Sequence, residues 1–237
     1  MRQLRGKNFM ADMVKNKIIC KKEIGDKVLS SDETGKYFDF NLLIPMAEEL
    51  NISGYDPMLG LLYYLEKHPE KARAIKRAME KKQLYGYGRI STYWDYMQAQ
   101  KCWGALGDLE KFAKEYEPDE DCLKQGIRTV DDFAQRLYDN IEAYGYAYWY
   151  DWRVANWWTK WPACNNKIKF DERTGKYTIK FETANCMPKG ILTAYSKLCA
   201  PGELYWVYRN EGAMWATRFT NPDGELLQVN VSPGKVY

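Results

Sequence analysis

Hydrophobic and polar residues alternate at both ends of the chain, and this period of two is typical of β-strands with one buried face. Near the N-terminus a strand is expected at Val14–Cys20. Phe40–Ile44 is expected to be extended because Pro45 disfavours helix in the residue before it. In the second half, strands are expected at Tyr148–Val154, Lys167–Phe170, Tyr177–Phe181, Glu203–Arg209, Ala213–Phe219 and, at an edge, Leu226–Val231. The aromatic strand Tyr148–Val154 is expected to anchor the sheet.

The middle of the chain instead follows helical spacing. Asp56 and Pro57 supply an N-cap acceptor and a proline at the first helical position. Thr129 and Asp132 resemble a capping box at the start of a second helix. Further helices are expected at residues 69–83, 93–116 and 188–199, with the acidic run Glu115–Asp121 as a loop. Roughly residues 56–144 are therefore expected to be helical.

The order of these elements predicts the fold class. One strand and a helical block are followed by strand–strand–helix–strand–strand, which predicts an α+β fold with an antiparallel sheet covered by helices on one face. The order approaches a ferredoxin-like split βαβ unit that is expanded by insertions. We expect residues 1–55 and 145–237 to form the ferredoxin-like sheet domain, and residues 56–144 to form a helical insertion packed on it.

Composition narrows the classes of function. The 237 residues are 46% hydrophobic and 15% aromatic, as in a globular protein, and the net charge is +3 from 35 basic and 32 acidic residues. This balance does not indicate a nucleic-acid binder unless the basic residues cluster locally. Six scattered cysteines without a CxxC pair, and one histidine, favour free thiols in a reduced, intracellular protein over a disulfide framework or a zinc site.

No hydrophobic run in the sequence reaches the length of a membrane helix, and the basic N-terminus precedes no signal-like segment. We therefore expect a cytoplasmic location, in the host cell if the protein is phage-encoded, without a membrane partner. No metal or cofactor is expected.

Three stretches resemble a known family. They are MADMVKNKI at Met10–Ile18, FDFNLLIPMAEELN at Phe38–Asn51 and YDWRVANWWTKWPA at Tyr150–Ala163. They look like the phage and plasmid proteins with the YubB ferredoxin-like domain, also called Api-like proteins, whose members typically read FDFNxIIPMPEELN and YxWxxxNWGTKWNA. The resemblance implies an origin on a mobile genetic element and a ferredoxin-like sheet. It implies neither iron–sulfur chemistry nor a particular catalytic activity.

The chain departs from this pattern at several positions. Trp158 stands where the family usually has glycine, and Ala47 where it usually has proline. FETANCMPKG at Phe181–Gly190 stands where the family has a strand ending in FxTAWSPP. If the family's usual start corresponds to Met10, the first nine residues are an upstream extension.

The most aromatic stretch, Tyr144–Trp161, contains five of the nine tryptophans. The simpler interpretation is a core in which large rings pack between sheet and helices. The alternative is that some rings lie on an exposed face between basic residues, as a stacking or protein-docking platform. The candidate platform residues are Trp149, Arg153, Trp157, Trp158, Lys160 and Trp161.

The segment Lys67–Lys82 is the most basic, with seven Lys or Arg residues against Glu70 and Glu80. Such a helix face is usually only solvated surface, but here it is also the best candidate for binding an anionic partner. The candidate basic patch is Arg73, Lys76, Arg77 and Lys81.

Catalytic motifs are not recognisable. His68 precedes a proline at a helix junction, where a structural role is the simpler interpretation, and the glycine-rich Tyr85–Ile90 lacks the spacing of a phosphate loop. We therefore expect a non-enzymatic phage or mobile-element accessory protein that binds a host protein or other host macromolecule, as an inhibitor of a host defence system. One alternative is a single-stranded nucleic-acid-binding protein that uses aromatic stacking and the basic helix. A second is a nucleotide-binding protein or enzyme with its site between sheet and helices.

Overall fold

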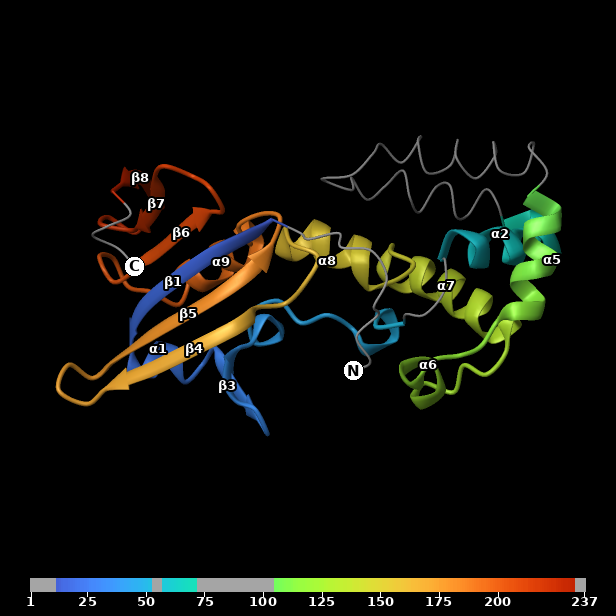
Figure 1. Cartoon of the computed structure of the whole chain (residues 1–237), viewed down its shortest axis with the longest axis horizontal. Helices are drawn as coiled ribbons and strands as arrows, with labels where there is room; N and C mark the ends of the chain where they lie inside the picture. Colours follow the sequence, from blue (N-terminus) through green and yellow to red (C-terminus); the bar gives the residue numbers. More distant parts are fainter. Residues whose placement is uncertain (1–11, 53–56, 72–104, 233–237) are drawn as a thin grey trace. The chain divides into compact units, whose positions relative to one another are not determined.

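The computed structural model describes residues 12–52, 57–71 and 105–232 (Figure 1). The chain groups into two compact units, one made of residues 1–45 with 156–237 and the other of residues 46–155. We refer to them as the sheet unit and the helical unit.

The sheet unit contains a six-stranded sheet in the order β4–β5–β1–β6–β7–β8, and every neighbouring pair is antiparallel. Helix α9 (Lys189–Ser196) connects β5 to β6 (Figure 1). The strands are β1 (Met13–Lys21), β4 (Cys164–Asp171), β5 (Lys176–Ala184), β6 (Trp206–Asn210), β7 (Ala216–Thr220) and β8 (Leu227–Val231). The order β6–β1–β5–β4 is that of a ferredoxin-like sheet, which β7 and β8 extend at one edge. The predicted α+β class with an antiparallel sheet is confirmed.

One face of the sheet packs on aromatic residues from several elements. Trp206 and Phe181 are nearly inaccessible to solvent, and their ring centroids lie 5.7 Å apart. Tyr195 of α9 packs edge-on against Trp206 at 5.6 Å, and Phe38 packs against Phe181 at 4.9 Å. Aromatic rings bury more apolar area than other side chains, so this cluster is the main stabilising core beneath the sheet.

Between β1 and the helical unit the chain forms small elements. They are α1 (Lys22–Gly25), a hairpin of β2 (Leu29–Asp32) and β3 (Gly35–Phe38), and the 3-10 turn η1 (Phe40–Leu42). The extended segment predicted at Phe40–Ile44 is therefore wrong in its first residues. The reason is local: a carboxylate oxygen of Asp39 accepts a hydrogen bond from the Asn41 amide at 2.9 Å and caps the turn.

The helical unit has its own hydrophobic core, with Leu61, Phe133, Leu137 and Ile141 at 0–1% exposure. Its described elements are η2 (Glu48–Leu50), α2 (Pro57–Lys67), η3 (Pro69–Lys71), α5 (Ala105–Glu115), α6 (Glu120–Lys124), α7 (Val130–Tyr144) and most of α8 (Trp149–Trp157). The predicted capping box at the start of α7 is confirmed. The acidic run predicted as a loop instead leads into α6, because a carboxylate oxygen of Asp119 accepts a hydrogen bond from the Cys122 amide at 2.8 Å.

The largest error of sequence reasoning concerns Tyr148–Val154, which was predicted as the anchoring strand. Residues 149–157 form helix α8 instead. So many positions of this stretch are aromatic or aliphatic that a period of two and a period of 3.6 both fit, and the strand propensity of aromatic residues favoured the wrong one. The helix brings Trp149 and Arg153 together four residues apart, with the guanidinium 4.8 Å from the ring centroid. A tryptophan-rich strand therefore does not anchor the sheet.

Candidate site on the open face of the sheet

The two faces of the central strands differ sharply in burial. In β1 the residues Val14, Asn16, Ile18 and Cys20 are buried and face the aromatic core, whereas the residues between them are exposed or half-buried. Strand β5 repeats this pattern. Because side chains alternate along a strand, the residues between the buried ones share the opposite face, which we call the open face.

Three lysines lie side by side across the open face. Lys17 of β1 is directly opposite Lys180 of β5, and Lys180 is directly opposite Lys167 of β4. We call these three residues the lysine row. Like charges that are directly opposite in a sheet destabilise it, so the row is a feature that packing alone does not favour.

A β-bulge in β4 places the third lysine in this row. Cys164 is opposite Glu182 and Lys167 is opposite Lys180, so two residues of β4 oppose the single Phe181 of β5. The first residue of the bulge, Asn165, has a φ of 51°, which asparagine tolerates better than most residues. Without this extra residue Lys167 would lie on the buried face.

Basic residues occupy the open face of β4, β5, β1, β6 and β7, whereas the residues of β8 on this face are apolar. Among its described strand residues nine are basic, namely Lys15, Lys17, Lys21, Lys167, Lys169, Lys176, Lys180, Arg209 and Arg218. Among the strand residues that the structure describes on this face, only Asp171 and Glu182 are acidic. Basic and acidic residues nearly balance over the whole chain, but basic residues predominate on this face. Such a surface attracts anions.

The electrostatics of the lysine row reflect this crowding. The pKa of Lys17 lies below its usual value, first because partial burial disfavours the charged ammonium and second because the Lys180 charge is close. The buried Nε of Arg218, farther along the same face, has no hydrogen-bond partner in the described part of the chain. An anion beside the lysine row would offset the repulsion between Lys17 and Lys180.

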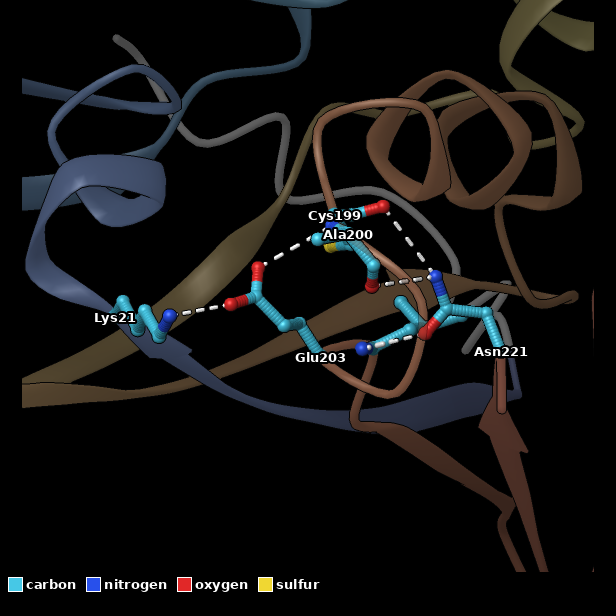
Figure 2. Close-up of polar contacts among 6 residues, drawn as sticks. Lys21, Cys199, Ala200, Glu203 and Asn221 are labelled. Carbon is cyan, nitrogen blue, oxygen red and sulfur yellow. Dashed lines mark hydrogen bonds and ion pairs between the residues drawn. The ribbon is translucent and has the colours of Figure 1, made fainter. Parts of the chain in front are cut away.

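The end of the face near Lys21 differs, because its charge is neutralised there. Glu203 forms an ion pair with Lys21 and accepts a hydrogen bond from the Ala200 amide at 3.2 Å (Figure 2). Asn221, which is 1% exposed, accepts a hydrogen bond from the Leu204 amide and donates to the carbonyls of Cys199 and Ala200. These bonds fix the loop before β6. The nearby cavity of about 430 Å³ has Lys21 and Lys176 against Glu203 in its lining, so much of its charge is offset and it is not the candidate site.

Comparisons with known proteins do not identify a function for this chain. No family model matches the chain, and no curated protein matches it. A similar solved structure is that of the protein api92 from Yersinia pseudotuberculosis, of the family DUF1281. It is 10% identical, the match covers 94% of this chain and 99% of that one, and the TM-score is 0.37. A likeness this weak carries no argument about function.

The predicted aromatic platform is not a single surface. Trp157 is fully buried beside Phe40 and donates from Nε1 to the Ile44 carbonyl at 3.0 Å. Trp158 and Trp161 are 42% and 38% exposed, and Lys160 lies 4.2 Å from the centroid of the Trp161 ring. Trp149 and Arg153 are half-buried members of the helical unit. A platform on one strand face is therefore ruled out, and Trp158, Lys160 and Trp161 remain as a smaller exposed group.

The other predicted functional residues contribute no site in the described structure. The basic patch of Arg73, Lys76, Arg77 and Lys81 lies outside the described residues. The His68 ring packs on Tyr64 at 4.5 Å, with its Nδ1 3.7 Å from the Glu70 carboxylate. Within the described ranges, no cluster of metal-ligating residues occurs and no helix could span a membrane.

Sequence reasoning missed the open face, although a signal was present. Within predicted strands, lysines stand two residues apart in KNK (Lys15–Lys17) and KIK (Lys167–Lys169). In KYTIK (Lys176–Lys180) they stand four residues apart, and Lys176 directly precedes a predicted strand. Their common face follows from the alternation. Whether lysines from different strands lie side by side depends on which strands pair, and the sequence pattern did not predict the pairing.

Proposed function

We propose that this protein is a binding protein whose open face docks a nucleic acid through its phosphate backbone. The observation that carries the proposal is the lysine row, in which Lys17, Lys180 and Lys167 oppose one another directly. Such an arrangement costs stability in the free protein. A polyanion that lies across the strands would offset that cost.

The spacing of the charges favours a repeating anion over a single one. Neighbouring strands lie about 4.8 Å apart, and alternate residues along a strand lie roughly 6.7 Å apart. The open face therefore presents ammonium groups as a regular two-dimensional array. A phosphate backbone carries one charge at every nucleotide, whereas acidic side chains of a protein partner are spaced irregularly.

The composition of the face indicates how the nucleic acid would be held. Seven of the nine basic residues are lysines. A lysine acts as a point charge and lacks the planar guanidinium group with which arginine recognises a base through two hydrogen bonds. The only described aromatic residue identified there is the half-buried Tyr205, which packs beside Val207. Attraction between lysines and phosphates would therefore take the place of the aromatic stacking that was one alternative from the sequence, and binding should depend weakly on base sequence.

The test is the salt dependence of oligonucleotide binding, measured by fluorescence anisotropy with labelled single strands and duplexes. The triple variant Lys167→Gln, Lys169→Gln, Lys180→Gln should bind more weakly. For single strands, the slope of log K against log salt should become shallower by about 2, since each lost phosphate contact contributes about 0.7.

A matched control changes three exposed lysines of the helical unit: Lys111→Gln, Lys114→Gln and Lys124→Gln. It alters the net charge by the same amount and should leave the slope unchanged. Equal weakening in both triple variants, or no binding of the unmodified protein at low salt, would refute the proposal.

The motif resemblance supports a second candidate function. We propose that the chain belongs to the Api-like family and, as a mobile-element protein, inhibits a host defence system by binding a host protein. The specific observation is that Trp158 and Trp161, within the motif at Tyr150–Ala163, remain exposed beside Lys160. Tryptophan is enriched among the residues that contribute most of the binding energy at protein interfaces.

This second candidate is tested by a pull-down from host lysate after nuclease treatment. It requires one partner at stoichiometric amount that is lost on Trp161→Ala and retained when Lys167, Lys169 and Lys180 are changed. A partner that disappears with nuclease, or with the lysine variant alone, would instead support the nucleic-acid function.

A further inference from the structure

A hollow of about 550 Å³ lies on the open face. Four basic side chains line it, one from each of four adjacent strands: Lys167 from β4, Lys180 from β5, Lys15 from β1 and Arg209 from β6. Asn165, Asn166 and Glu182 line it as well. Its volume lies within the range of small-molecule sites, which is about 300–1,000 Å³.

We propose that this hollow, which we call the basic hollow, binds a di- or triphosphate group. The inference rests on the proposed function, because the basic hollow belongs to the same open face. The polyphosphate could come from the phosphorylated end of a nucleic acid or from a free nucleotide. The two sources share one chemistry, and the experiment below separates them.

The charge of the basic hollow calls for a multiply charged anion. Four cationic side chains face one carboxylate, that of Glu182, whose Oε2 already accepts a hydrogen bond from Asn165 at 2.6 Å. Among the residues that the structure describes, Lys167, Lys180 and Arg209 have no ion pair. A phosphate monoester carries about 1.5–2 negative charges near neutral pH, so one phosphate only partly neutralises the excess and a chain of phosphates does so more fully.

Arg209 is held in an orientation suited to this role. Its Nε donates to the Ala213 carbonyl at 2.9 Å within the turn between β6 and β7. This bond restrains the guanidinium group while its terminal nitrogens can still donate to two oxygens of one phosphate. Lys180 and Lys167 would contribute point charges beside it.

The same lining indicates what the basic hollow does not recognise. Phe181 is the aromatic residue among those that line it, and it is 2% exposed, so no ring is available to stack on a base. Binding should therefore depend on the number of phosphates and little on the base. Inorganic tripolyphosphate is the appropriate first probe.

The experiment measures tripolyphosphate binding to the full chain by titration calorimetry. The variant Lys180→Gln, Arg209→Gln should bind at least tenfold more weakly than the unmodified protein. The control Lys169→Gln, Lys176→Gln removes two charges from the same open face outside the basic hollow and should bind normally. Arg209→Lys, which keeps the charge but loses the fork, should give an intermediate affinity.

Circular dichroism establishes that each variant is folded. Absence of tripolyphosphate binding, or equal loss in the two double variants, overturns the inference. If oligonucleotides still bind with a salt dependence carried by the lysine row, the proposed function survives that failure. If tripolyphosphate binds in the basic hollow and no oligonucleotide binds, the nucleic-acid function fails while the site stands.

The source of the phosphates follows from competition. A terminal-phosphate site requires that a 5′-triphosphorylated oligonucleotide binds more tightly than its 5′-hydroxyl counterpart, and that this advantage disappears in Lys180→Gln, Arg209→Gln. A free-nucleotide site requires equal binding of the two oligonucleotides together with similar affinities for ATP, GTP and tripolyphosphate.

Discussion

Among the described residues, Trp158 is the one whose backbone conformation fits its side chain least well. Its φ is 67°, in the left-handed region, where a bulky side chain costs about 1–2 kcal/mol. This conformation gives a physical reason for the glycine that stands here in the family the motif resembles. The Cys186 thiol donates a hydrogen bond to the Trp158 carbonyl, and this bond helps to hold the backbone in that conformation.

We expect Trp158→Gly to be about 1–2 kcal/mol less destabilising than Trp161→Gly in urea unfolding. The two tryptophans are 42% and 38% exposed, so both substitutions remove a similar ring contact and add the same unfolded-state entropy. Trp161 is not among the described non-glycine residues with positive φ, so only Trp158→Gly releases backbone strain. Equal losses of stability in the two variants would contradict this account.

Asp151 in α8 is a second residue in an unfavourable position, because its carboxyl group is buried. Burial without an opposing charge raises its pKa from 3.8 to about 6, so the folded chain retains a proton that the unfolded chain releases. Because the pKa is raised, the contribution of Asp151 to stability is fully present below about pH 4 and is lost as the pH rises through 6. Ionised Asp151 therefore destabilises the fold at neutral pH.

Asp151→Asn should consequently raise the free energy of unfolding by about 1–3 kcal/mol at pH 7.5 and have little effect at pH 4. Denaturant unfolding at both pH values measures this. The control Asp223→Asn, at an exposed turn, should reproduce the pH profile of the unmodified chain. A stabilisation of the same size at pH 4 would show that side-chain volume, and not charge, is responsible.

At the scale of secondary structure, the lysine row should lower the stability of the sheet. Lys180 has a lysine on each side, whereas Lys176 has Lys21 on one side and Asp171 on the other. Lys180→Gln should therefore raise the free energy of unfolding by roughly 0.2–1 kcal/mol at low salt, while Lys176→Gln should not. The gain should shrink in 0.5 M NaCl because salt screens exposed charges. A loss of stability in Lys180→Gln at low salt would show that its aliphatic stem, rather than its charge, dominates.

The elements differ in how far the sequence could predict them. The alternation in Val14–Cys20 and Tyr177–Phe181 indicates strands because one side of each faces the core. Helix α8 escaped prediction because aromatic residues occupy too many positions to select one period. The lysine row was not predicted because Lys17 pairs with Lys180 at a sequence separation of 163 residues, and no local pattern encodes that register. The φ of Trp158 is likewise set by its surroundings, since nothing about tryptophan itself favours it.

At the scale of the whole molecule, each unit has its own core. Ile18 lies at 0% exposure in the sheet unit and Leu137 at 0% in the helical unit. Replacing a fully buried Ile or Leu by Ala typically costs about 2–5 kcal/mol, and two separate cores allow separate cooperative unfolding. We therefore expect Ile18→Ala to destabilise the sheet unit selectively and Leu137→Ala the helical unit.

Hydrogen exchange followed by mass spectrometry resolves the two units, because peptides from β1 and β5 report on one and peptides from α7 on the other. Ile18→Ala should lower the protection of the strand peptides and leave α7 protected, and Leu137→Ala should do the reverse. Loss of protection in both sets of peptides on either substitution would mean that the chain unfolds as a single cooperative body. In that case the lysine row and the basic hollow would be coupled to the stability of the helices, and substitutions in the helical unit such as Leu137→Ala would weaken oligonucleotide binding as well.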